Sequence, residues 1–135
     1  MKRFTLVLLL ALAGCSGTQL LYRQASTPVQ YVKVVLLHHN AIGEQVADLR
    51  ADPSVNPQRK AQLLELYRAT VCDAAEIESK VSTAGCVNGP AEKLEAAAKA
   101  YESAGNATNQ AEMQKAVNEL VSLLVSLIPA VNGAK

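Results

Sequence analysis

LVSLLVSLI, residues 120–128, is the stretch that decides the fold. As a helix, its apolar side chains surround most of the circumference, and only Ser122 and Ser126 are polar. The stretch is too short to span a membrane, which takes roughly 18–20 apolar residues. Since a surface helix needs only one apolar stripe, something must cover its second face. It is either the central helix of a bundle, which we favour, or it presents Val121, Leu123 and Val125 to another protein, a second copy or the membrane.

Three other segments repeat apolar residues at spacings of three and four, the period of one helix face. Together the four segments predict an all-α fold, with helices over residues 28–50, 58–82, 91–103 and 109–128. Thr27 and Asn109 are the expected caps of the first and last helices, and Pro129 and Gly133 close the last one. Short connections between amphipathic helices favour an antiparallel up-and-down bundle of about four helices. No segment alternates with period two, so no sheet is expected.

The first helix is expected to be buried over a broad face. Its inward positions are Tyr31, Val35, His38, Ile42, Gln45/Val46 and Leu49, and the face is widened by Val34, Leu37 and Ala41. His38 is therefore expected in the core, and His39, about 100° away on a helix, is expected to face water. Metal ligands on one helix need spacings of three or four, and no ligand type stands at those distances from either histidine. The sequence predicts no metal site and no cofactor.

The amino-terminal end has the composition of an export signal. Lys2 and Arg3 carry positive charge, residues 4–12 form an apolar run that only Thr5 interrupts, and small residues precede Cys15. A charged start, a short apolar core and a small-residue exit are typical of a signal peptide. The apolar run is too short for a membrane-spanning anchor.

Leu12-Ala13-Gly14-Cys15 resembles the lipobox of bacterial lipoprotein precursors, in which an aliphatic residue and two small residues precede the lipidated cysteine. The resemblance covers only the first 15 residues. It implies a signal peptide of residues 1–14 that is removed, a diacylglyceryl group on the Cys15 sulfur, and an acylated amino terminus. Residues 15–28 would form the lipidated terminus and a tether, and residues 29–135 a single helical domain. Ser16 at the second mature position implies the outer membrane, facing the periplasm, rather than the inner membrane.

Cys72 and Cys86 are the only thiols that remain once Cys15 is acylated. An exported domain enters a compartment in which disulfides persist, so we expect these two cysteines to form one disulfide. If the second helix continues to Ser82, residues 83–86 must fold back beside it to bring the alpha carbons within about 5.5 Å. A reactive or metal-binding pair is the alternative, although the C-x-x-C spacing of such sites is absent.

Charge and composition exclude some classes of partner. Without residues 1–14 the chain has 11 basic and 12 acidic residues, since two of the 13 basic residues lie in that segment. This balance argues against nucleic acid or anionic lipid as the main partner, because both demand a concentrated basic face. Asp73, Glu76 and Glu78 are interpreted as a solvated acidic face, on which Lys80 follows Glu76 at the favourable helical spacing.

No arrangement of serine, histidine or glycine residues matches a catalytic or phosphate-binding motif. We therefore expect a non-enzymatic, lipid-anchored interaction protein of the cell envelope. Its expected partners are the membrane, through the lipid on Cys15, and another envelope protein or a second copy. The pilotins, which escort secretins to the outer membrane, are similar in architecture but share no motif with this chain. The alternatives are an immunity or exclusion lipoprotein that protects against a toxin, phage or plasmid, and an envelope enzyme.

Overall fold

The computed structural model describes residues 27–134, whose regular elements are all helices. The elements are α3 (Pro28–Ala51), α4 (Pro57–Val71), α5 (Ala74–Glu78), the 3-10 helix η1 (Thr83–Gly85), α6 (Pro90–Ser103) and α7 (Ala107–Asn132). The predicted all-α bundle and its disulfide are confirmed. The predicted export signal, Cys15 and the predicted tether up to residue 26 lie outside the described residues.

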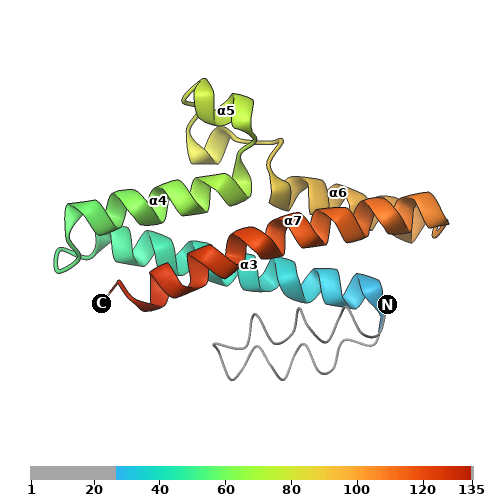
Figure 1. Cartoon of the computed structure of the whole chain (residues 1–135), viewed down its shortest axis with the longest axis horizontal. Helices are drawn as coiled ribbons and strands as arrows, with labels where there is room; N and C mark the ends of the chain where they lie inside the picture. Colours follow the sequence, from blue (N-terminus) through green and yellow to red (C-terminus); the bar gives the residue numbers. More distant parts are fainter. Residues whose placement is uncertain (1–26, 135) are drawn as a thin grey trace.

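Figure 1 shows how the helices are arranged. The two long helices, α3 and α7, run in the same direction and cross, and α7 packs against α3, α4 and α6. The shorter helices α4 and α6 run in the opposite direction, one after the other, so that each covers part of the long pair. The segment between them, which contains α5 and η1, projects away from the bundle. Successive helices of a simple up-and-down bundle alternate in direction. Here α4 and α6, which follow each other in this bundle, run in the same direction.

The stretch 120–128 lies in α7, which is the central helix of the bundle. The buried side chains of α7 are Met113, Ala116, Val117, Leu120, Val121, Leu124, Leu127, Ile128 and Val131. Val121 is only 4 % exposed, Leu123 is half-buried and Val125 is 45 % exposed. The three residues suggested for partner binding therefore do not form one exposed surface, because Val121 belongs to the core. By length and composition alone α7 could also cross a membrane, but its buried apolar side chains form part of the core of the bundle.

The helix ends follow from their caps. Thr27 caps α3 as predicted, since its hydroxyl accepts a hydrogen bond from the backbone N–H of Gln30 at 3.2 Å. The predicted cap of the last helix, Asn109, is wrong by one turn. Asn106 is the cap, and its side chain accepts the N–H of Asn109 at 2.8 Å. Pro129 does not close this helix either, because it continues past the proline to residues that pack in the core.

The third helix agrees with its predicted range, but the second does not. α4 ends at Val71, and Cys72 follows it in an extended conformation. A new short helix, α5, starts here with a capping box, in which the Asp73 and Glu76 side chains each accept the backbone N–H of the other residue. Lys80 has a left-handed backbone with φ 56°, so the helical spacing predicted for Glu76 and Lys80 is lost.

The buried face of α3 lies to one side of the predicted one. The expected inward positions are all buried except Gln45, which is exposed while its neighbour Val46 is buried. Leu37, however, is 61 % exposed and Ala41 is exposed too, so the prediction that they widen the buried face is wrong. Val32 and His39 extend the face on the other side, where His39 contacts α4.

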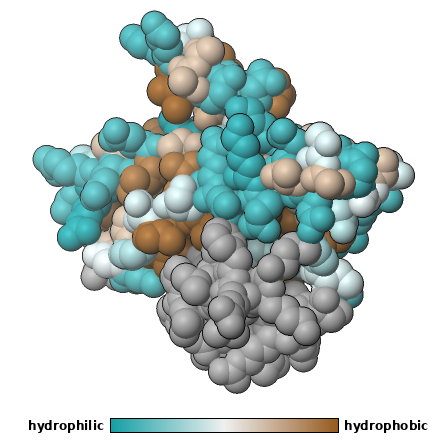
Figure 2. All heavy atoms as spheres, turned by 45° about the vertical axis from the view of Figure 1, so that its right-hand side comes forward, coloured by the Kyte–Doolittle hydropathy of each residue, from teal (hydrophilic) through white to brown (hydrophobic). Residues whose placement is uncertain are grey.

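Few large apolar side chains remain on the surface. Figure 2 shows a mostly hydrophilic face, with apolar residues on the projecting segment and in a patch on the body below it. Within residues 27–134, the exposed large apolar side chains are Leu37, Ile77, Val87 and Val125. Ile77 and Val87 belong to the projecting segment, and Leu37 lies on the outside of α3.

Candidate functional site

We call residues 73–88, the segment that projects between α4 and α6, the disulfide lobe. The Cys72–Cys86 disulfide closes it, with alpha carbons 5.0 Å apart, so the predicted pairing is confirmed. The route differs from the prediction, since the chain returns through α5 and η1 instead of folding back along one continuous helix. Gly89 then lies against the end of α4. A side-chain carbon at Gly89 would be 2.1 Å from the backbone carbon of Val71, so only glycine allows α6 to start at this point.

A buried carboxylate joins the two ends of the disulfide lobe. Glu76 is 9 % exposed, and it accepts three backbone N–H groups: those of Asp73 at 3.0 Å, Val87 at 2.7 Å and Asn88 at 3.1 Å. These bonds connect the start of α5 to the chain just after the disulfide. The interpretation of Glu76 as part of a solvated acidic face is therefore wrong, because its carboxylate is structural.

We expect Glu76 to make the stability of the protein depend on pH. The backbone N–H of Asp73, followed by that of Val87, lowers the pKa of this carboxyl from its ordinary 4.5, while burial opposes the shift. A carboxyl with a lowered pKa stabilises the folded state above its unfolded pKa, and this contribution is lost as the pH falls through the folded pKa.

The Glu76→Gln variant should therefore melt at a lower temperature than the unchanged protein, with the largest difference at neutral pH. The amide can accept fewer bonds, and its NH2 group would face backbone N–H groups. Thermal unfolding at about pH 7 and about pH 3, on either side of the usual carboxyl pKa, measures the effect. The exposed Glu78→Gln on the same helix is the control. An equal difference at both pH values would contradict the role of the ionised carboxylate.

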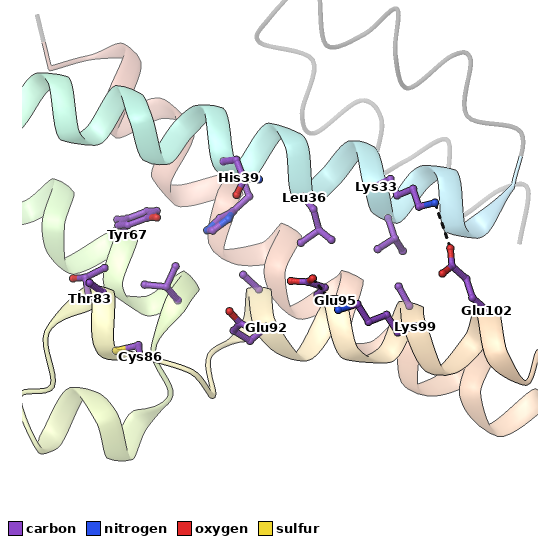
Figure 3. A pocket seen from close by; sticks show the side chains of 16 residues that line it. Lys33, Leu36, His39, Tyr67, Thr83, Cys86, Glu92, Glu95, Lys99 and Glu102 are labelled. Atoms are coloured by element: carbon purple, nitrogen blue, oxygen red, sulfur yellow. Dashed lines mark ion pairs between the residues drawn. The ribbon is translucent and has the colours of Figure 1, made fainter.

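A groove of about 560 Å³ runs between α3 and α6 and is bounded by α4 and the disulfide lobe. Figure 3 shows the side chains that point into it from these four parts of the chain. We call it the α3–α6 groove. Its apolar residues include Val32, Leu36, Tyr67, Val71, Ala91 and Ala98, and its polar and charged residues include Lys33, Asn40, Glu92, Glu95, Lys99 and Glu102. Its volume falls within the usual range of ligand sites, roughly 300–1,000 Å³.

Charged side chains of both signs form the rim of the α3–α6 groove. Lys33 Nζ lies 3.3 Å from Glu102 Oε1, which joins α3 to α6, and Lys99 Nζ lies 3.2 Å from Glu95 Oε1 (Figure 3). All four side chains are largely exposed, so these pairs add little to stability. They remain available to exchange partners with a bound molecule, whereas the floor offers apolar surface.

His39 lines the groove and is only 4 % exposed, so the prediction that it faces water is wrong. The Thr70 hydroxyl donates to the carbonyl of Tyr67 at 2.6 Å, and it therefore accepts the Nε2–H of His39 at 2.8 Å. The imidazole also stacks on the Tyr67 ring, with centroids 5.7 Å apart. Burial, followed by the charge of His38, lowers the pKa of His39. The neutral ring thus ties α3 to α4.

The chemistry that the groove can perform follows from these contacts. The Thr70 hydroxyl is fully buried and donates its proton to a carbonyl, so it is not placed as a nucleophile. Within residues 27–134, no three His, Cys, Asp or Glu side chains are grouped so that they could hold a metal ion. The arrangement suits reversible binding of a molecule with an apolar side and charges of both signs.

Comparison with known proteins adds no assignment: no protein-family model, curated protein or solved structure matches the chain. Sequence patterns missed the groove because four separate segments build it. One signal was present, since Val32 and Leu36 are apolar but lie off the predicted buried stripe of the first helix.

Proposed function

We propose that this protein is a lipid-anchored, non-catalytic binding protein of a bacterial cell envelope. The lipobox-like residues 12–15 support anchoring through Cys15, and Ser16 supports the periplasmic face of the outer membrane as its place. The Cys72–Cys86 disulfide agrees with export, because disulfides persist in the periplasm and are rare in the cytosol.

The α3–α6 groove is the observation that carries the binding role. Its α6 side extends from Glu92 to Glu102, which is about 15 Å of helix at 1.5 Å per residue. An apolar floor of this length between charged edges fits a short amphipathic segment, as in other helix-in-groove complexes. We propose that the ligand is such a segment of another envelope protein, with an apolar stripe and charges of both signs that pair with the rim.

Site-specific photo-crosslinking in intact cells tests this proposal. A photoreactive amino acid replaces Glu95 on the groove rim, and in a matched strain it replaces Glu112, an exposed residue of α7 that does not line the groove. We expect a discrete adduct with one envelope protein from position 95 and a several-fold weaker one from position 112. Equal adducts from both positions, or none from position 95, would contradict binding in the groove.

Charge reversal provides the second arm of the same experiment. Glu92→Lys should reduce the adduct formed from position 95, because it removes the carboxylate that faces a cation of the ligand. Glu112→Lys makes the same change of charge outside the groove and should leave the adduct unchanged. If the crosslinked protein is an imported toxin or a phage protein, the binding role is protective instead of structural.

A further inference from the structure

The outside of α3 near its amino-terminal end carries exposed apolar side chains. Gln30, Val34, Leu37 and Ala41 follow one another at spacings of four, three and four, so they share one face of the helix. Leu37 is 61 % exposed, Gln30 and Ala41 are exposed, and Val34 is half-buried. We call these four residues the outer face of α3.

Charge divides this helix into two halves. From Thr27 to Gly43 it contains no carboxylate, and apart from its two buried histidines Lys33 is its only basic residue. The first acidic residues on the line of the outer face are Glu44 and Asp48, in the second half. The half that begins the described chain therefore carries no negative charge, whereas the other half contains Glu44, Asp48 and the exposed Arg50.

The half without negative charge is also the part of the bundle nearest in sequence to Cys15. The 12 residues from Ser16 to Thr27 can reach at most about 40 Å when fully extended. A lipid on Cys15 therefore keeps the start of α3 within that distance of the membrane.

We propose that the outer face of α3 rests on the lipid surface to which the protein is anchored, with Leu37 inserted between the headgroups. This inference rests on the proposed anchor. A lipid surface fits better than a second copy, because a stable protein interface buries about 800 Å² per partner and this face offers one leucine with small neighbours. Contact with the membrane needs no such area, since the lipid anchor already holds the protein there and keeps the local concentration of lipid around α3 high.

The orientation leaves the binding site open. Leu36 points into the α3–α6 groove, and successive helical residues lie about 100° apart. When Leu37 faces the lipid, the groove therefore opens sideways along the membrane surface, toward other envelope proteins.

Tryptophan fluorescence tests the orientation, because the chain contains no tryptophan of its own. Leu37→Trp is compared with Val87→Trp, a control on the disulfide lobe with a nearly equal exposure of 65 %. The chain from Cys15 onward is coupled to a maleimide phospholipid in vesicles of phosphatidylethanolamine and phosphatidylglycerol with brominated acyl chains. Cys15 is then the only free thiol, since Cys72 and Cys86 form the disulfide. This coupling supplies the anchor artificially, so the result does not depend on lipidation in the cell.

We expect the tryptophan at position 37 to shift its emission to shorter wavelength and to lose most of its intensity to the bromine atoms, while the tryptophan at position 87 keeps both. Quenching at position 87 alone, equal quenching at both positions, or no quenching at position 37 would each overturn the proposed orientation. A lack of lipid on Cys15 in cells would instead refute the anchor while leaving this result valid.

Discussion

The double variant Cys72→Ala/Cys86→Ala is expected to lose about 3 kcal/mol of unfolding free energy, the chain-entropy contribution of a loop of this size. The bridge joins residues separated by 14 positions. For a domain of about 100 residues such a loss lowers the melting temperature by roughly 10–20 °C. This is a large share of a total stability that is on the order of 5–15 kcal/mol.

The lobe that the disulfide closes contributes little apolar surface to the core. The loss of stability in the double variant should therefore come mainly from the greater conformational entropy of its unfolded chain. Thermal unfolding of the oxidised protein, of the double variant and of the protein unfolded in reductant measures it. The last two should coincide. A double variant that melts at the temperature of the oxidised protein, or two free thiols in the exported protein by mass spectrometry, would contradict the role of the bridge.

The Cys15→Ala variant is expected to lose lipid attachment completely and to keep residues 1–14, because the lipobox resemblance implies that only the lipidated precursor is cleaved. In the unchanged protein, two or more acyl chains would hold the mature chain at the membrane almost irreversibly. Metabolic labelling with a fatty-acid analogue, followed by intact mass spectrometry of the chain, measures both effects. Lipid label retained in the alanine variant would contradict the anchor.

Ser16→Asp is the matched control for this experiment. It leaves Cys15 in place, so the variant should keep its label and its membrane association. If the second mature residue sorts the protein as the lipobox resemblance implies, this variant should move from the outer membrane to the inner one.

Periodic apolar residues predicted the fold correctly for the long helices, and most accurately where a capping residue marks the start of the helix. The range of α3 and its Thr27 cap were predicted correctly, and so was the burial of α7, because nearly every position of 120–128 is apolar. The break after Val71 was missed. It depends on the Asp73–Glu76 capping box and on backbone groups of Val87 and Asn88 that come close only in the folded chain.

The candidate site was harder to predict than the fold. The disulfide followed from counting cysteines in a chain that was expected to be exported, which needs no tertiary structure. The groove depends on which face of α3 turns toward the core. Leu37 was predicted to be buried and His39 to face water. In the structure the buried face is turned toward α4, so Leu37 is exposed and His39 is buried. Periodicity locates such a stripe only to within about one residue, since neighbouring positions lie about 100° apart.

The intact mass of the protein extracted from bacterial membranes tests the central claim most directly. The account predicts a chain that begins at Cys15, carries a diacylglyceryl group and a further acyl chain, and is lighter by the two hydrogens lost in the Cys72–Cys86 disulfide. A chain that keeps residues 1–14, or that begins elsewhere and carries no lipid, would contradict it.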